Sequence, residues 1–465
     1  MKERLTLLIR RATYNMRGGF LVRPLLIALV LGCVGAVLSW LEEVVPAVSG
    51  WVPVVIFPSH ADPQVAQVIL AGIAASIMTV VSIVFAILLM TLTMASMQFS
   101  PRIMLSFTRD RVTQWTLGIF LGTFLYCIAA LPAARSLPAP FSPVATVLGA
   151  VLLALACVCW LLFFIQHIAL AISVNRIVDK IAAETEAVID EMMPWPRQEV
   201  SLPKQAPPQG HTFEFSIPND RSGYIRFIDV DQLLALANAY RISVRVLRRV
   251  GHFVPAHVAL LAVSKSERLP PEGKAALLGA FDIGASRTLQ QDVEFGVLQI
   301  VDIALRALSP AVNDPSTAIS CVDQLSRILI RFISREPPAS LLYDLPGMPR
   351  VILAWIDFDG LLDAAFEQTR LYSNADVAVS LRLLRALGDI SSTTTVPEFR
   401  RTLVQRARRI VVGCRTRLVG EDLGKADERL RTLEHLLAQV ETVERSGSPE
   451  SSGKPVVDGQ TLPAL

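Results

Sequence analysis

The chain has 465 residues, 52% of them hydrophobic, and a formal net charge of +3, which is too small to argue for nucleic-acid binding. Its mean hydropathy of +0.47 is high for a soluble protein and hides a division. Up to about Ile177 the chain consists mostly of long apolar runs, and beyond that residue its composition is ordinary and charged.

Four apolar runs in the first part predict membrane-spanning helices. They are Pro24–Leu41, Val65–Met97, Val112–Leu131 and Val144 to about Val174. As one helix, the second run would be about 50 Å long, whereas the hydrocarbon core of a bilayer is about 30 Å thick. This helix is therefore expected to tilt, bend or project from the membrane.

The loops between the runs predict the orientation. The N-terminal segment and the segments after the second and fourth runs are basic, and the other two loops carry few basic residues. Because basic segments stay on the cytoplasmic side, both termini are expected in the cytoplasm.

The second run has small and hydroxyl residues at near-helical spacing, among them Ser76, Thr79 and Ser82. Such a stripe is typical of close helix packing, and it could instead line a narrow wet pathway. Runs two to four contain no Asp, Glu, Lys or Arg, which argues against an ion-coupled pump.

Basic residues follow the end of the second run, where Pro101 is expected to break the helix. Arg102, Arg109 and Arg111 would form a collar beside the membrane. The collar can be explained by topology and by attraction to anionic head groups. The alternative is an anion-collecting inner mouth of a pore.

The remaining chain divides by composition into four segments. They are a helical extension and Pro-rich linker (178–210), a small α+β module (211–265), a helical domain (266–445) and a disordered tail (446–465). The first 177 residues form the predicted four-helix transmembrane domain.

The last predicted helix carries an apolar seam with alternating spacings of three and four residues. Its members are Leu423, Ala426, Leu430, Leu433, Leu437 and Val440. The seam would pack either inside a bundle of this chain or against a second copy.

The stretch from Ser286 to Leu325 holds the densest set of polar residues in apolar surroundings. Asp302 and Arg306 have the i,i+4 spacing of an ion pair on a helix that looks buried all round. Asp314 before Pro315 suits an N-cap, so two helices should meet at a sharp turn. The candidate polar cluster comprises Arg287, Asp292, Asp302, Arg306, Asn313 and Asp314. It is either the structural centre of a domain core or a ligand or subunit contact.

The sequence resembles a bacterial family of predicted membrane proteins labelled domain of unknown function 2254. The resemblance rests on Gln98-Phe99-Ser100-Pro101-Arg102, Gly223-Tyr224-Ile225, Arg287-Thr288 with Gln291-Asp292, and Ala307-Leu308-Ser309-Pro310 with Asn313-Asp314-Pro315 and Thr317-Ala318. It covers nearly the whole chain except the tail. It implies a bacterial inner-membrane protein with a cytoplasmic domain, and it implies no catalytic residues.

These observations predict an α-helical membrane protein with four transmembrane helices and a cytoplasmic, mainly helical α+β second half. The chain has no nucleophile elbow, phosphate loop or metalloprotease motif, and its six cysteines lack zinc-ligand or redox spacing. We therefore expect no enzyme, metal or cofactor. A self-associating, channel-like protein in the lipid bilayer, passing or binding an unidentified small ion or ligand, is the first interpretation. A membrane-anchored ligand-binding or sensory module is the alternative.

Overall fold

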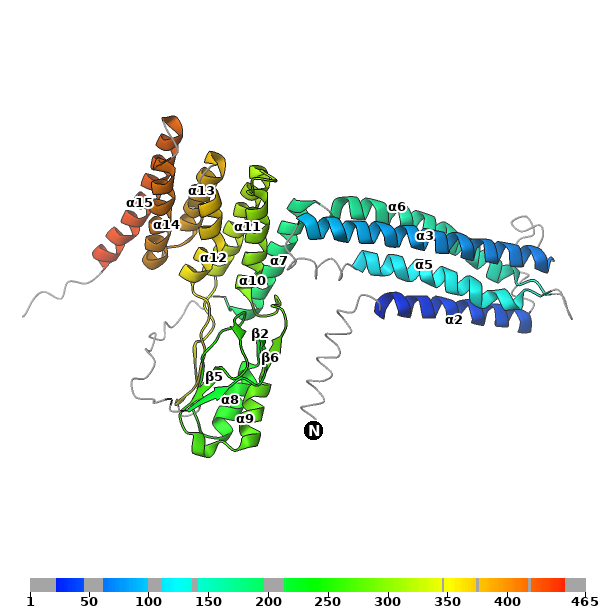
Figure 1. Cartoon of the computed structure of the whole chain (residues 1–465), viewed down its shortest axis with the longest axis horizontal. Coiled ribbons are helices and arrows are strands. Elements are labelled where there is room, and N and C mark those ends of the chain that lie inside the picture. Colours follow the sequence, from blue (N-terminus) through cyan, green and yellow to red (C-terminus); the bar gives the residue numbers. More distant parts are fainter. Residues whose placement is uncertain are drawn as a thin grey trace, which may run out of the picture. The chain divides into compact units, whose positions relative to one another are not determined.

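The computed structural model describes residues 22–45, 62–98, 111–135, 141–171, 173–195, 213, 215–344, 347–373, 376–416 and 420–447. The chain forms two compact units, Met1–Ile177 and Val178–Leu465, and each is described by itself (Figure 1). Arg102, Arg109, most of the Pro-rich linker and nearly all of the predicted tail lie outside the described residues.

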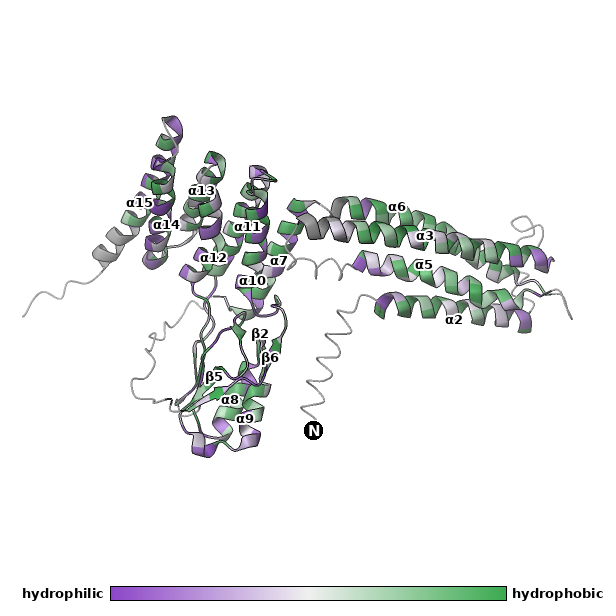
Figure 2. Ribbon diagram, in the orientation of Figure 1, coloured by the Kyte–Doolittle hydropathy of each residue, from purple (hydrophilic) through white to green (hydrophobic). Residues whose placement is uncertain are grey.

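Among the described residues of the first unit, four helices are long and apolar enough to span a membrane. They are α2 (Val22–Val44), α3 (Pro63–Gln98), α5 (Arg111–Ala130) and α6 (Val144–Ala171), and the short 3-10 turn η2 (Leu131–Ala133) follows α5. Hydrophobic residues cover them along most of their length (Figure 2). The four apolar runs of the sequence are thus confirmed as helices.

Glycines bring α2 and α5 close together. A Cβ atom at Gly118 would lie 2.8 Å from Ile27 Cδ1, and one at Gly122 would lie 2.4 Å from Leu31 Cδ1. The order of these contacts shows that α2 and α5 run in the same direction. Gln67 at the start of α3 donates to the carbonyl of Ala134 just beyond α5, at 2.6 Å. The bundle therefore runs up and down, and α2 begins on the side where α6 ends.

Two β-sheets and two helices form the core of the α+β part of the second unit. The five-stranded sheet has the order β1 (Phe215–Pro218), β5 (Ala259–Val263), β3 (Val244–Val246), β8 (Pro349–Ile352) and β7 (Leu341–Tyr343). The three-stranded sheet has the order β4 (Phe253–Val254), β2 (Gly223–Ile228) and β6 (Phe281–Gly284). Helices α8 (Val230–Ala239) and α9 (Pro271–Gly279) pack with them, and η3 (Ser266–Arg268) precedes α9.

Only the β3–β8 pair is parallel among the described strand pairs, and the others are antiparallel. Ile225, Leu233 and Leu261 lie fully buried in the shared core. Strands β6, β7 and β8 come from outside residues 211–265, so the sheets recruit chain from both sides of the central polar stretch.

The remaining helices form three stacked hairpins (Figure 1). They are α10 (Val293–Ala307) with α11 (Pro315–Ile333), α12 (Phe358–Ser373) with α13 (Val377–Thr393), and α14 (Pro397–Arg415) with α15 (Glu421–Gly447). Helix α7 (Val174–Met192) precedes them in the chain and packs on α10 and α11. Ion pairs join neighbouring hairpins, as between Arg382 on α13 and Asp323 on α11.

Helix α15 directs its apolar seam into this stack. Ala426 and Leu433 are buried, and α15 packs against α13 and α14. These seam residues therefore serve packing within one chain, because their apolar surface is already covered by two other helices.

Candidate functional site

A charged cluster lies where α10 begins. Arg287 donates from Nε and Nη2 to the two carboxylate oxygens of Asp292, both at 2.7 Å, and from Nη2 to Glu294 Oε2 at 2.9 Å. Arg249 donates to Glu294 Oε1 at 3.0 Å and to His252 Nε2 at 2.9 Å. Two cations, two carboxylates and one imidazole are thus joined in one network, which we call the charged cluster.

Local sequence builds this cluster from two segments. Asp292 is the N-cap of α10, and its Oδ1 accepts from the backbone N–H of Phe295 at 3.0 Å. Gly251, in the turn that also carries Arg249 and His252, has a φ of +86°, and a Cβ there would lie 2.4 Å from Asp292 Oδ2. Only glycine allows this turn to approach the helix so closely.

Gln291 ties the same helix start to the three-stranded sheet. Its side chain accepts from the backbone N–H of Ile228 at 2.9 Å and donates to the carbonyl of Ile228 at 3.2 Å. Because the charged cluster and Gln291 hold two different parts of the α+β core, together they clamp that core onto α10.

The charges of the cluster balance one another. Burial raises the pKa of Glu294, but Arg249 and Arg287 outweigh it and hold this pKa below its ordinary value. Burial opposes the charge of Arg287, yet its hydrogen bonds to Asp292 and Glu294 raise its pKa. Burial and the charge of Arg249 lower the pKa of His252. With neutral His252 the network has no net charge, as expected of a structural clamp rather than of a group prepared to react.

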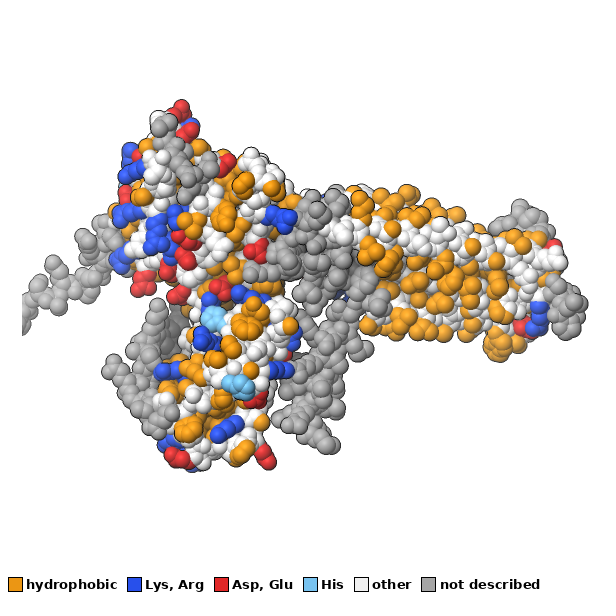
Figure 3. Space-filling model, viewed as in Figure 1, with side chains coloured by type: hydrophobic (Ala, Val, Ile, Leu, Met, Phe, Trp, Pro, Cys, Tyr) orange, Lys and Arg blue, Asp and Glu red, His pale blue; other side chains and the backbone are white. Residues whose placement is uncertain are grey.

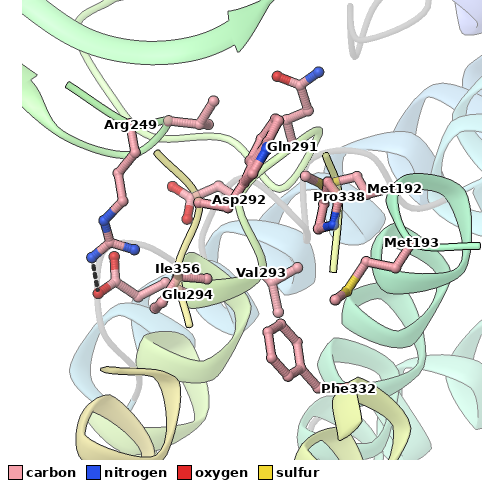
Figure 4. A pocket seen from close by; sticks show the side chains of 12 residues that line it. Met192, Met193, Arg249, Gln291, Asp292, Val293, Glu294, Phe332, Pro338 and Ile356 are labelled. Carbon is pink, nitrogen blue, oxygen red and sulfur yellow. Dashed lines mark hydrogen bonds and ion pairs between the residues drawn. The ribbon is translucent and has the colours of Figure 1, made fainter. Parts of the chain in front are cut away.

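A small cavity adjoins the charged cluster (Figure 4). Arg249, Asp292 and Glu294 line its charged part, and apolar side chains including Met193 and Phe332 line the rest. Its volume of about 30 Å³ suits about two water molecules. The cavity can therefore hold water or a small ion.

The six polar residues predicted as one cluster do not come together. Arg287 and Asp292 lie at the start of α10, whereas Arg306, Asn313 and Asp314 lie at its other end. The two ends are about 21 Å apart at 1.5 Å per residue. Arg306 is exposed and Asp302 is half-buried, so the expectation that this helix buries both charges is wrong.

The turn between α10 and α11 satisfies its own polar groups. Asp314 caps α11 by accepting from the N–H and the hydroxyl of Thr317 at 3.1 and 2.6 Å, and these bonds lower the pKa of Asp314. Asn313 is exposed, has a φ of +49° and donates its N–H to the carbonyl of Ser309 at 2.9 Å. The predicted helix–turn–helix is present, and its hydrogen bonds are local.

The hydroxyl stripe of α3 faces outward. Ser76, Thr79 and Ser82 are exposed, and a Cβ added at Gly72 would contact nothing within 4 Å. Thr79 and Ser82 donate to carbonyls of the preceding turn at 3.1 and 3.0 Å. Packing of this stripe against the other described helices of the same chain is therefore excluded. Arg111, the only described member of the predicted basic collar, is exposed at the first position of α5.

A buried carboxylate lies one residue beyond the first apolar run that the sequence predicted. Glu42, in the last turn of α2, accepts from the N–H groups of Ala145 and Thr146 at 2.8 and 3.1 Å and from the Thr146 hydroxyl at 3.0 Å. It thus caps the start of α6 from another helix. Its helical spacing from Gly35 and Ser39, which are also buried, was the available signal.

Comparisons with known proteins agree with the membrane architecture. Residues 17–389 match a family described as predicted membrane protein (DUF2254). Uncharacterized proteins of Mycobacterium bovis and of Mycobacterium tuberculosis are each 31% identical to the chain over 396 residues, which is 84% of this chain and 75% of the relative. No solved structure matches the chain.

Proposed function

The chain belongs to the DUF2254 family of predicted membrane proteins, and we propose that it forms a channel-like homo-oligomer in the bacterial inner membrane. In this proposal, the unit Val178–Leu465 lies in the cytoplasm and regulates the assembly, and no residue is catalytic. The observation that carries the proposal is the outward-facing stripe of small and hydroxyl residues on α3.

The interior of a single bundle is filled. Leu70, Val84, Phe120 and Phe164 from three different helices are almost fully buried inside it. A pathway for ions would therefore have to run between copies of the chain. This requirement makes the channel proposal dependent on self-association.

The stripe suits a contact between copies. Small residues at Gly72, Ser76 and Thr79 would let the backbone of a neighbouring helix approach closely, which is how helices associate in lipid. Thr79 and Ser82 already donate to their own helix, so their oxygens remain free to accept hydrogen bonds from water. A ring of α3 helices could then present these oxygens to a narrow path.

The basic loops support the cytoplasmic placement. Arg111 stands exposed at the start of α5, and the sequence places Arg102 and Arg109 in the loop before it. Positive loops stay in the cytoplasm. At the inner mouth of a pore, the same residues would favour anions.

Disulfide cross-linking in native membranes tests the assembly. Ser76→Cys and Thr79→Cys would be made in a chain whose exposed cysteines, Cys33 and Cys159, are replaced by serine. Leu155→Cys is the matched control, because Leu155 on α6 is 64% exposed but lies off the stripe. We expect oxidation to link copies at positions 76 and 79 and not at 155. A monomeric protein in mild detergent with no stripe-specific cross-link would refute the proposal.

Ion flux into liposomes then tests the pore. Thr79→Trp should block flux by filling the path, and Arg109→Glu should shift selectivity toward cations. Flux indistinguishable from that of protein-free liposomes would leave an assembly without a channel.

The second candidate is a membrane-anchored sensory or ligand-binding module without transport. The cavity beside the charged cluster favours it, because an ion of suitable size could bind near Glu294 and alter the clamp. A monomer without flux whose heat stability rises with one particular salt would support this candidate over the channel.

A further inference from the structure

The three helical hairpins place their turns on one edge of the stack. Ala307 at the end of α10, Ala318 near the start of α11 and Val379 near the start of α13 pack in one cluster. Arg429 near the start of α15 donates to the carbonyl of Leu381 near the start of α13. The helix ends that flank the three hairpin connections are therefore neighbours, and we call this side of the stack the turn edge.

Large apolar side chains are exposed along the turn edge. Val312 in the first turn is 51% exposed, and Leu371 and Tyr372 at the end of α12 are 52% and 60% exposed. Val412, one helical turn before the end of α14, is also exposed. Each hairpin thus contributes to the edge, and Figure 3 shows exposed hydrophobic side chains among the charged ones on the stack. Exposed apolar residues that recur on one side of a domain indicate a contact surface.

Helix α7 begins on the same side of the stack. Arg327 of α11 pairs with Asp179 at 2.8 Å and with Glu186 at 2.6 Å. Farther along, Arg331 on α11 and Arg335 just beyond its end both pair with Asp190 at 2.6 Å. This order shows that α7 and α11 run in the same direction.

The ion pairs also fix the level at which α7 begins. Arg327 lies about 18 Å along α11 from its first residue, and the midpoint of Asp179 and Glu186 lies about 13 Å along α7 from Val174. The start of α7 is therefore within about 5 Å of the level of the turn edge.

The covalent chain keeps the start of α7 close to the end of α6, whatever the relative positions of the two units. Helix α6, a candidate membrane span, ends at Ala171, and α7 begins at Val174. The three residue steps between them reach at most about 11 Å. One point of the turn-edge level is thus held next to the end of a membrane span.

We infer that the turn edge is a lipid-contact surface, with Val312, Leu371 and Tyr372 reaching into the interfacial layer of the bilayer. Tyrosine is enriched in this layer, and leucine is among the side chains that interfacial helices bury there. The contact requires neither a pore nor an oligomer, so it stands apart from the proposed channel. It would hold the helical stack against the membrane at a second place besides α7.

Site-directed spin labelling of the full chain tests this inference. Nitroxide labels would be attached to Val312→Cys and Tyr372→Cys, in the chain whose Cys33 and Cys159 are serine, after reconstitution into phosphatidylethanolamine–phosphatidylglycerol nanodiscs. The control is Val396→Cys, because Val396 is 40% exposed in the α13–α14 connection, on the opposite edge of the stack. All three positions are exposed, so the labels should leave the fold intact, which gel filtration would check.

The measured quantity is the accessibility of each label to oxygen, which concentrates in lipid, relative to a water-soluble nickel chelate. We expect this ratio to be severalfold higher at positions 312 and 372 than at position 396. Equal ratios at the three positions would overturn the inference. Labels at 312 and 372 that are shielded from both oxygen and the nickel chelate would also overturn it. Dipolar broadening between labels would then show that a second copy of the chain covers this surface.

Discussion

Helix α7 should depend on a notch at Gly296 for its place on α10. A Cβ added at Gly296 would lie 2.0 Å from Thr185 Oγ1 and 2.9 Å from Thr185 Cγ2. Thr185 is buried, and its hydroxyl is held by a 2.7 Å hydrogen bond to the carbonyl of Ile181. Because Thr185 is buried and its hydroxyl is held by this hydrogen bond, the methyl group added by Gly296→Ala should push α7 and α10 apart.

The magnitude follows from two opposing effects. Overpacking a core by one methyl group costs typically about 1–3 kcal/mol, and replacing glycine by alanine within a helix returns about 1 kcal/mol. We therefore expect Gly296→Ala to lower the free energy of α7 docking by up to about 2 kcal/mol. Thr185→Ala alone should cost about 1 kcal/mol through the void that it leaves. The double variant should be close to the parent, because the new methyl group occupies that void.

Hydrogen exchange of the α7 amides measures this local opening in the full chain. Gly296→Ala should speed exchange in α7 by up to roughly 30-fold, and the double variant should restore most of the protection. The favourable coupling between the two substitutions should be up to about 3 kcal/mol, since the double variant should avoid the cost of both single ones. Unchanged exchange in Gly296→Ala, or a double variant less protected than either single one, would refute the notch.

Three further predictions concern single residues. Glu42→Ala should lower the heat stability of the detergent-solubilised protein well beyond Glu43→Ala. The buried amide of Thr146 and the part-buried amide of Ala145 lose their acceptor at about 1–3 kcal/mol each, whereas the exposed Glu43–Arg135 pair is worth up to about 1 kcal/mol. Similar melting temperatures would contradict the cap. The pKa of His252 is lowered from 6.5 by burial and by Arg249, so its stabilising effect is complete above about pH 6.5 and is lost as the pH falls through the lowered value. His252→Gln should therefore flatten the fall in stability toward acid pH, and parallel profiles would show that the imidazole plays no part. Asp314→Ala should lower the stability of the protein by about 1 kcal/mol and speed hydrogen exchange in the first turn of α11. Asn313→Gly should be tolerated, because the φ of Asn313 is already +49°. Equal effects of the two substitutions would contradict the capping role.

The sequence determined the features that depend on neighbours along the chain. Each apolar run is long and uncharged enough to predict a membrane-spanning helix by itself, and the described residues contain four helices of suitable length and composition. Asp314 before Pro315 determined the start of α11 in the same way, because an N-cap bonds only to backbone three residues ahead. The family resemblance could likewise be recognised from the sequence, because its motifs consist of residues that are close together along the chain.

Tertiary structure decided what each side chain faces. The outward direction of the α3 stripe, the burial of Glu42 beneath α6 and the inward packing of the α15 seam all depend on which helix lies alongside. The polar stretch around α10 illustrates the limit: residues close in sequence were separated by the length of one helix, while Arg249 was brought in from a distant turn. Helical periodicity identifies a face of a helix, but only packing between segments far apart in the chain determines whether that face meets lipid, a neighbouring helix or a charged partner.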